Sequence, residues 1–402
     1  MRPGVATPSN FPLALWEVQN LAYFHRIHPT EPRVLYHDPE NRIVVMEGLE
    51  GSYHTRLSEH YRRFFKLGSP EQRRHLQSTV VREVKDILHL STSLFLRATQ
   101  EVVTFDPHAP QQYTINDQLL AVRPPKKDAL VRRLKERLNY LYNPLVFLTK
   151  RDQTTTNTDV ALLAAQGAFA EWHSRTLAAE ELQRLGNYLN RQELLSHLDL
   201  RPENVLFKSE GTKTAYAVCD LTDIAMGPAN YDVVSFLMDP RLNVLLSLQE
   251  RQKIHNEFFA YPNGSVTLAM REKLGVPPSL HDNTSFLYSA LSAVIRDIGA
   301  TFAFIYNRDP SETSRVRADI RQLSSPKNLP LPTNLKFLAV EYITLCHLLT
   351  LTKQSLPDLY EGVLSLCPDD AQRRNLESRL LDEENRPALV RDFHDDYLLK
   401  LR

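Results

Sequence analysis

The 402-residue chain is long enough for two or three lobes around sizeable hydrophobic cores. Its composition, 42% hydrophobic and 24% charged, is typical of a soluble globular protein. The 48 Lys and Arg residues equal the 48 Asp and Glu residues, so no overall charge attracts the chain to nucleic acid or to an anionic membrane.

Three cysteines, Cys219, Cys346 and Cys367, are too few and too scattered for a disulfide framework or a metal site. No apolar segment reaches the roughly 18 residues that a membrane span requires. The first residues carry one basic side chain and no apolar region of the kind found in signal peptides. We therefore expect a cytoplasmic protein without nucleic-acid or membrane partners.

Glycine is scarce and proline is plentiful, 12 against 25 residues, which predicts many short helices ended by prolines. Apolar residues at near-helical spacing predict a helix from Leu13 to about His28. The segments RVLYHD (33–38) and RIVVMEGLEG (42–51) then predict two strands joined by the turn DPEN.

A longer helix is predicted from Pro70 to about Leu96, because Ser69, Pro70 and Gln72 form a typical helix start. Residues 98–125 are mixed in character and are expected to be loop-like. A basic amphipathic helix is predicted at 128–142, with its charges on a solvated face.

The segment 159–177 predicts another helix, which leads into LSHLDL (195–200). The segments ENVLFK (203–208) and TAYAVCDL (214–221) alternate like a short pair of strands. Beyond residue 230 the pattern is almost wholly helical. A long apolar helix is expected to start at Asn283, and a second one is expected at about 335–351.

Four polar residues in the central segment point to phosphoryl transfer: His197, Asp199, Asn204 and Asp220. This reaction needs a carboxylate to orient and deprotonate the acceptor hydroxyl, and oxygen ligands to hold Mg²⁺ against the nucleotide phosphates. An Asp and an Asn on one loop entering a strand can supply both functions. The strand pair after Asn204 would bring Asp220 close to Asp199. Each residue alone is a weak signal, but the ordered set is far more specific.

Residues 194–238 resemble the catalytic half of the aminoglycoside phosphotransferase and choline kinase-like family, which has a protein-kinase-like fold. HLDLRPENVLF resembles the catalytic loop of this family, and VCDLTDIAMGPANYDVVSFL resembles its metal-binding Asp strand and the helix that follows. Upstream, WEVQNLAYFHRI resembles the helix that bridges the two lobes. PRVLYHDPENRIVVMEGLEG resembles two N-lobe strands that lead into the hinge.

The resemblance implies that Asp199 is the catalytic base and that Asn204 and Asp220 are the Mg²⁺ ligands. It further implies that Asp232 braces the backbone of the catalytic loop, while His197 packs beneath that loop. Since the reaction supplies no role for an imidazole, His197 is interpreted as structural rather than catalytic.

For the nucleotide, the resemblance implies a contact of the adenine with the backbone of Glu47, Gly48 and Leu49, and it places Glu17 on the bridging helix. Two roles stay open. Arg201 either touches a phosphate or the acceptor, or it is a solvated side chain. Asp223 is either a carboxylate behind the site or an exposed turn residue.

The sequence departs from the family in its N-terminal part. The family has a Gly-rich turn and a strand with a Lys before the bridging helix, whereas no Lys occurs here before Lys66 and no G-x-G-x-x-G occurs anywhere. Three interpretations remain: an N-terminally truncated form of an active kinase, a degenerate pseudokinase, or an arginine such as Arg33 or Arg42 in place of the Lys.

We therefore predict an α+β, protein-kinase-like two-lobed fold with a truncated N-lobe and a large, mainly helical C-lobe. Residues 1–50 would form the partial N-lobe with its bridging helix, two strands and hinge. Residues 51–402 would form the C-lobe, with the catalytic segment at 194–238 and a helical insertion at about 52–157. This insertion either shapes the substrate pocket or only adds to the core.

The predicted function is transfer of the γ-phosphate of ATP, with Mg²⁺, to a hydroxyl group of a small molecule. The partners would be a nucleotide and this acceptor, which the sequence does not identify further. The alternative is a catalytically impaired pseudokinase that binds a ligand or a protein. The short GPANYD passage, with no A-P-E motif after it, argues against a protein kinase.

Overall fold

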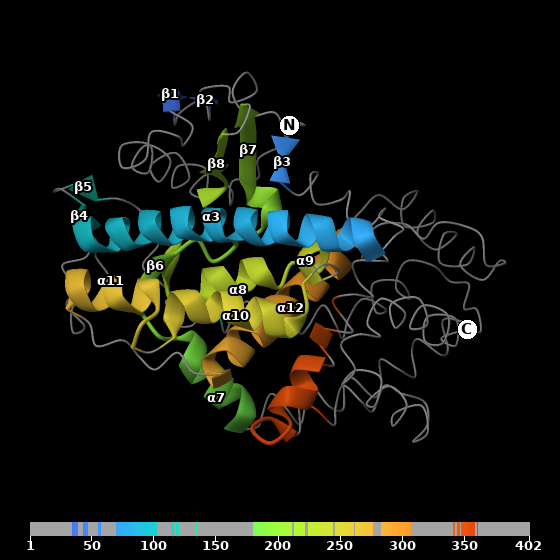
Figure 1. The fold of residues 1–402 in the computed structure, drawn as a ribbon. Helices are drawn as coiled ribbons and strands as arrows, with labels where there is room; N and C mark the ends of the chain where they lie inside the picture. Colours follow the sequence, from blue (N-terminus) through green and yellow to red (C-terminus); the bar gives the residue numbers. More distant parts are fainter. Residues whose placement is uncertain are drawn as a thin grey trace, which may run out of the picture. The chain divides into compact units, whose positions relative to one another are not determined.

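The computed structural model describes residues 34–38, 43–46, 55–57, 70–102, 114–115, 118–119, 130, 134, 180–210, 213–221, 224–243, 246–260, 262–275, 283–306, 341, 344–345, 347–357 and 360 (Figure 1). The chain divides into two compact units. Unit 1 comprises residues 1–129 and 190–282, and unit 2 comprises residues 130–189 and 283–402. The predicted lobe boundary at residue 50 and the predicted insertion stay predictions.

Unit 1 contains several small antiparallel sheets. Strands β1 (Val34–Asp38) and β2 (Ile43–Met46) pair with each other, which confirms the two strands predicted for this part of the chain. The central sheet has the order β3-β7-β8. Its strands are β3 (Thr55–Arg56), β7 (Val205–Glu210) and β8 (Lys213–Val218).

The β7–β8 pair agrees with the strand pair predicted at 203–208 and 214–221. Its register runs from Val205 opposite Val218 to Glu210 opposite Lys213. Two further pairs complete the described strands of unit 1. They are β6 (Leu194–Ser196) with β9 (Ala225–Gly227), and β4 (Thr114–Ile115) with β5 (Gln118–Leu119).

Helix α3 (Pro70–Val102) starts where the sequence predicted a helix, but the predicted end near Leu96 is wrong. One face of this end of the helix is buried, and Ala98 and Thr99 are almost fully shielded from solvent. The Thr99 hydroxyl donates to the carbonyl of Phe95 and accepts the backbone N–H of Leu195 in β6. Tertiary packing thus extends the helix beyond the local sequence signal. The supposedly loop-like segment 98–125 also includes β4 and β5.

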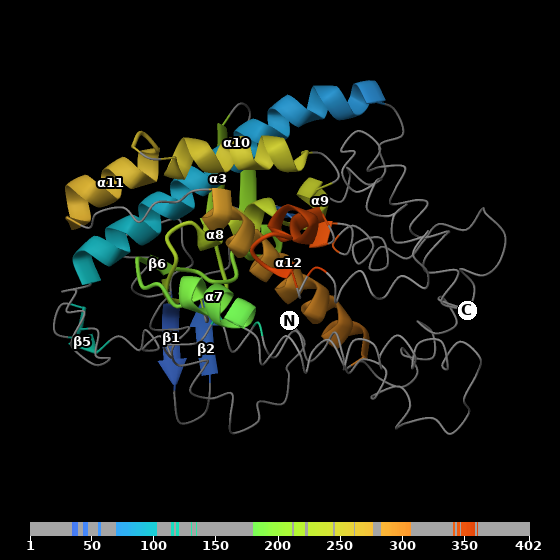
Figure 2. The same cartoon turned by 90° about the horizontal axis from the view of Figure 1, so that it is seen from below.

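Four helices follow the strands of unit 1: α8 (Tyr231–Leu237), α9 (Pro240–Asn243), α10 (Leu248–Phe259) and α11 (Ser265–Leu274). Figures 1 and 2 show α10 and α11 running along α3, and in Figure 1 the β7–β8 pair lies on the opposite side of α3. An ion pair of 2.7 Å between Lys85 and Glu257 joins α3 to α10.

Local sequence signals explain how α10 and α11 begin. Ser247 and Glu250 form a reciprocal capping box, because each side chain accepts the backbone N–H of the other residue. At the start of α11, a Cβ atom on Gly264 would lie only 2.5 Å from the carbonyl oxygen of Phe258, so this position requires glycine.

The described helices of unit 2 include α7 (Glu180–Leu189) and α12 (Asn283–Tyr306). The Tyr188 hydroxyl lies 2.9 Å from the Ser289 hydroxyl, so the two helices are joined by a buried hydrogen bond. Helix α12 begins at Asn283 as predicted. Four of its apolar residues at helical spacing are buried: Leu287, Leu291, Val294 and Ile298.

The described residues are mostly helical with a few small sheets, which agrees with the predicted α+β class. No helix that the structure describes is both long enough and apolar enough to cross a bilayer.

Candidate active site

The candidate site forms on the loop between β6 and β7, residues 197–204, within unit 1. Both flanking strands are fixed by antiparallel partners, because β6 pairs with β9 and β7 pairs with β8. Just past β8, the backbone N–H of Cys219 donates to the carbonyl of Asn204 at 2.8 Å, and the Cys219 carbonyl lies 3.0 Å from Nε2 of His197. The backbone that leads into Asp220 therefore lies along the loop.

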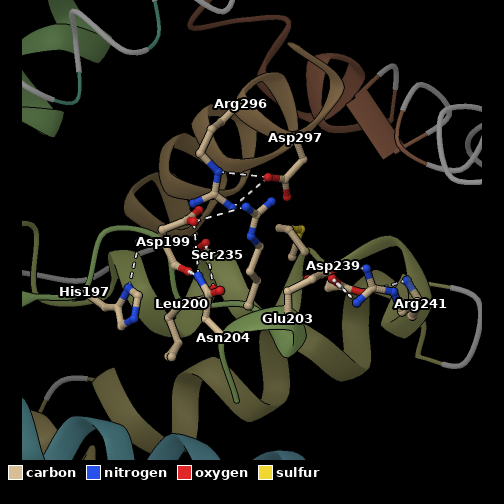
Figure 3. Close-up of polar contacts among 12 residues, drawn as sticks. His197, Asp199, Leu200, Glu203, Asn204, Ser235, Asp239, Arg241, Arg296 and Asp297 are labelled. Carbon is tan, nitrogen blue, oxygen red and sulfur yellow. Dashed lines mark hydrogen bonds and ion pairs between the residues drawn. The ribbon is translucent and has the colours of Figure 1, made fainter. Parts of the chain in front are cut away.

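The side chain of His197 is fully buried and supports the loop from inside (Figure 3). Its Nδ1 accepts the backbone N–H of Asp199 at 3.3 Å, so the proton sits on Nε2, which donates to the Cys219 carbonyl. The ring also makes an edge contact with Phe95 of α3. Both nitrogens make hydrogen bonds to the backbone, which agrees with the prediction that His197 is structural.

Asp232, in the first turn of α8, holds the start of the loop. One carboxylate oxygen accepts the N–H of His197 at 2.6 Å, and the other accepts the N–H of Leu198 at 2.9 Å. Leu198 has a φ of +60°, in the left-handed region that non-glycine residues rarely adopt. Such a residue costs about 1–3 kcal/mol and persists only where its surroundings impose it. The carboxylate of Asp232 supplies that restraint directly before Asp199.

Asn204 and Arg201 both contact the carboxylate of Asp199. The Asn204 amide donates through Nδ2 to the Asp199 carbonyl at 2.8 Å and to its Oδ2 at 3.2 Å. Nη2 of Arg201 lies 3.2 Å from the same Oδ2. Both side-chain contacts therefore restrain the Oδ2 atom of Asp199. Because both hydrogen bonds of the Asn204 amide use Nδ2, its Oδ1, the atom type that binds a hard cation, takes no part in them.

Asp220 stands just beyond the end of β8 and has an exposed side chain. Its φ of +62° is also left-handed, a conformation that Asp tolerates better than most residues. The turn lets the chain leave the strand next to the loop, at a position where Asp220 is exposed.

Five of the residues named for the site lie outside the described residues: Glu17, Glu47, Gly48, Leu49 and Asp223. Arg33 and Arg42, the considered replacements for the missing Lys, also lie outside them. Their roles stay predictions.

The sequence matches the phosphotransferase enzyme family over residues 6–263, more than half of the chain. The chain belongs to this family. The match includes the loop at 197–204, Asp220 and α8, and it confirms the resemblance to aminoglycoside phosphotransferases and choline kinase-like proteins. No curated protein shows significant similarity to the chain.

Membership in the phosphotransferase family implies a protein-kinase-like fold and a nucleotide together with a small-molecule substrate. Members generally use ATP and Mg²⁺. The donors present fit such a cation, since Mg²⁺ is usually bound through one or two carboxylates with nucleotide phosphates and water completing its octahedron. Asp220 and the amide oxygen of Asn204 are the residues that would hold it.

Two further contacts of the loop, and a third contact that supports one of them, were not predicted from the sequence. The Ser235 hydroxyl of α8 donates to the carbonyl of Leu200 at 3.2 Å. Glu203 pairs with the buried guanidinium of Arg241, which also lies 3.4 Å from a carboxylate oxygen of Asp239 (Figure 3). The spacing of Asp232 and Ser235, one helical turn apart, could have indicated the first contact. The Arg241 contact has no comparable local signal.

Proposed function

We propose that this phosphotransferase transfers the γ-phosphate of ATP to a hydroxyl group of a small molecule. The observation that carries the proposal is the hydrogen-bond network that joins Asp199, Asn204 and the backbone before Asp220. It brings one candidate base and two candidate metal ligands to the same end of the β7–β8 pair. Phosphoryl transfer depends mainly on such positioning and on electrostatic stabilisation.

In the proposed reaction, the acceptor oxygen forms a bond to the γ-phosphorus, and the bond from that phosphorus to the bridging oxygen breaks as ADP leaves. The carboxylate of Asp199 orients the acceptor hydroxyl and receives its proton. Asn204 and Asp220 would hold Mg²⁺, which neutralises charge on the phosphate oxygens. Arg201, which pairs with Asp199, would also lie within reach of the transferred group or the acceptor.

The test is ADP formation from ATP and Mg²⁺ with a panel of choline, hexoses, amino sugars, aminoglycosides and homoserine. We expect at least one acceptor to raise the rate, and Asp199→Asn to lower kcat by roughly 100-fold to 10,000-fold with little change in nucleotide affinity. Asp220→Ala should remove the Mg²⁺ dependence of nucleotide binding. Asp86→Asn, on the exposed side of α3, is the matched control and should behave like the wild type.

The second candidate is a pseudokinase that binds a ligand or a protein without catalysis. It is favoured by one observation: no Lys precedes Lys66 in the printed sequence, whereas the family carries a Lys before the bridging helix that orders the α- and β-phosphates. Isothermal titration with ATP at several Mg²⁺ concentrations distinguishes the two functions. A stably folded chain that binds no nucleotide at any Mg²⁺ concentration would exclude the enzyme and leave the binding module.

A further inference from the structure

We propose that Arg241 is a positioning residue for the metal site. Through Glu203 it fixes the short turn that carries Asn204, and so it sets the affinity of the site for a metal–nucleotide complex. This inference rests on the proposed function, because it assigns to Asn204 the role of metal ligand. The two residues themselves touch neither the acceptor nor the phosphates in the proposed reaction.

The turn that carries Asn204 has few restraints of its own. It is the three-residue 3-10 helix η2 (Pro202–Asn204), closed by one backbone hydrogen bond of 2.8 Å from the N–H of Asn204 to the carbonyl of Arg201. Arg201 stands at its N-cap and provides no side-chain cap. Pro202 contributes no N–H. Asn204 itself is held by the Cys219 N–H and by its own contacts with Asp199, so the side chain of Glu203 is the remaining point at which the rest of the protein can restrain the turn.

That contact is the ion pair between Glu203 and Arg241. The side chain of Arg241 is 6% exposed and that of Glu203 is 32% exposed, so the guanidinium is buried while the carboxylate reaches it from the loop. Asp239 holds Arg241 on the other side. Its carboxylate accepts the backbone N–H of Arg241 at 2.9 Å and lies 3.4 Å from the Arg241 guanidinium. Arg241 is thus anchored to the start of α9 before it reaches Glu203.

The arrangement completes a series of three anchors that follow the loop in order. Asp232 binds the N–H groups at 197 and 198, Ser235 binds the carbonyl of Leu200, and Arg241 binds the side chain of Glu203. The first two anchors act near the candidate base. The third one acts next to Asn204, at the end of the loop where the metal would bind.

The charge of Glu203 suggests a competing role, and the two roles predict opposite results. A carboxylate beside Asn204 could itself attract the cation, in which case Arg241 would be its competitor and removing Arg241 would strengthen metal binding. If Arg241 instead positions the turn, removing either partner weakens metal binding. Removing one partner of an ion pair that is partly buried is also costly, because the other partner is left as an uncompensated charge.

The experiment uses the full chain with Mn²⁺ as the probe, titrated in the presence of a non-hydrolysable ATP analogue and followed by the EPR signal of free Mn²⁺. We expect Glu203→Gln and Arg241→Ala each to raise the Kd for Mn²⁺ by about 10-fold. The double variant should be no weaker than the weaker single variant, since both changes break the same contact. Arg241→Lys should restore part of the affinity, and binding of the analogue without metal should stay unchanged.

Val84→Ala, a cavity-forming change in the buried face of α3, controls for lost stability. It should lower Tm without changing the Kd for Mn²⁺. Tighter Mn²⁺ binding by Arg241→Ala, or wild-type binding by both single variants, would overturn the proposal.

Hydrogen exchange of the protein without ligands separates this inference from the proposed function. Arg241→Ala and Glu203→Gln should speed exchange of the amides of 198–204, whereas Val84→Ala should not do so selectively. Unchanged exchange in that segment overturns the positioning role whether or not nucleotide binds. If exchange responds but the wild type binds no Mn²⁺–nucleotide, the proposed function fails, and with it the assignment of Asn204 as a metal ligand.

Discussion

A carboxylate oxygen of Asp232 lies 2.9 Å from the backbone nitrogen of Leu198, the residue with left-handed backbone directly before the candidate base. A buried helix thus restrains an unfavourable conformation at the loop that would carry out the chemistry. Energy stored in this way is common at functional sites, where surrounding structure imposes the geometry.

Replacing Asp232 by Asn should lower both stability and activity. An amide oxygen can still accept one of the two N–H groups, but the new NH₂ group would face the other one. We expect a loss of about 1.5–3 kcal/mol in the free energy of unfolding, measured by urea denaturation, because hydrogen bonds to a charged acceptor are involved. Phosphotransfer should fall further than this loss explains, since the loop also moves.

The matched control for that experiment is Glu193→Gln. The Glu193 carboxylate also accepts a backbone N–H, that of Ala229 at 3.0 Å, but it does not hold the loop. This variant should lose stability without losing activity. Equal losses of activity in both variants would contradict a specific role for Asp232.

Substitutions at Leu198 test the backbone restraint directly. Both Leu198→Gly and Leu198→Ala remove the buried side chain, but only glycine adopts a φ of +60° without strain. The Gly variant should therefore be more stable than the Ala variant by about 1 kcal/mol in chemical denaturation. Leu200 is equally buried and is not among the residues with positive φ. At this control position the Ala variant should therefore be more stable than the Gly variant.

His197→Phe should destabilise the protein without changing the shape of its pH–rate profile. Phenylalanine keeps the edge contact with Phe95 but loses both hydrogen bonds of the ring, at an expected cost of about 1–3 kcal/mol in the free energy of unfolding. His89→Phe, at an exposed position of α3, is the control with little expected effect. A titration step that disappears only in His197→Phe would show that the imidazole takes part in catalysis.

Because of Tyr216 in β8, the stability of the protein should fall as the pH rises into the alkaline range. Burial raises the pKa of its hydroxyl well above the usual value, and the carboxylates of Glu83 and Asp86 raise it further. The folded state therefore favours the neutral phenol. This contribution is fully present below about pH 10, the value of an unfolded tyrosine, and is lost as the pH rises toward the folded pKa.

The measurement for Tyr216 is the difference in unfolding free energy between the wild type and Tyr216→Phe at pH 8, 9.5 and 11. The difference should be constant between pH 8 and pH 9.5. At pH 11 the wild type should have lost stability relative to Tyr216→Phe. A difference that stays flat to pH 11 would show that the phenol ionises as easily in the folded protein as in the unfolded chain.

The sequence predicted the residues of the candidate loop and the two strands that follow it. Three of the four residues whose order indicated phosphoryl transfer, His197, Asp199 and Asn204, lie in one hydrogen-bond network. This network also includes Asp232, which the family resemblance had placed behind the loop. The alternating segments on both sides of residue 211 predicted β7 and β8 within a few residues, because a half-buried strand has a clear two-residue period.

The anchors of the loop could not be predicted in the same way. In the sequence, Asp239 and Arg241 look like a charged turn around a proline, and only the folded chain brings Glu203 to them. The end of α3 was misjudged for a related reason. Its last turns contain no strong local signal, and burial against β6 decides their conformation.

Every residue of α8 is buried, although the helix is only seven residues long. In a saturating mutational scan, positions 231–237 should therefore form one continuous block of low tolerance, unlike α11, which has both exposed and buried positions. Engineering for a new acceptor should leave this block untouched, since nearly any replacement there disturbs the scaffold before it alters selectivity.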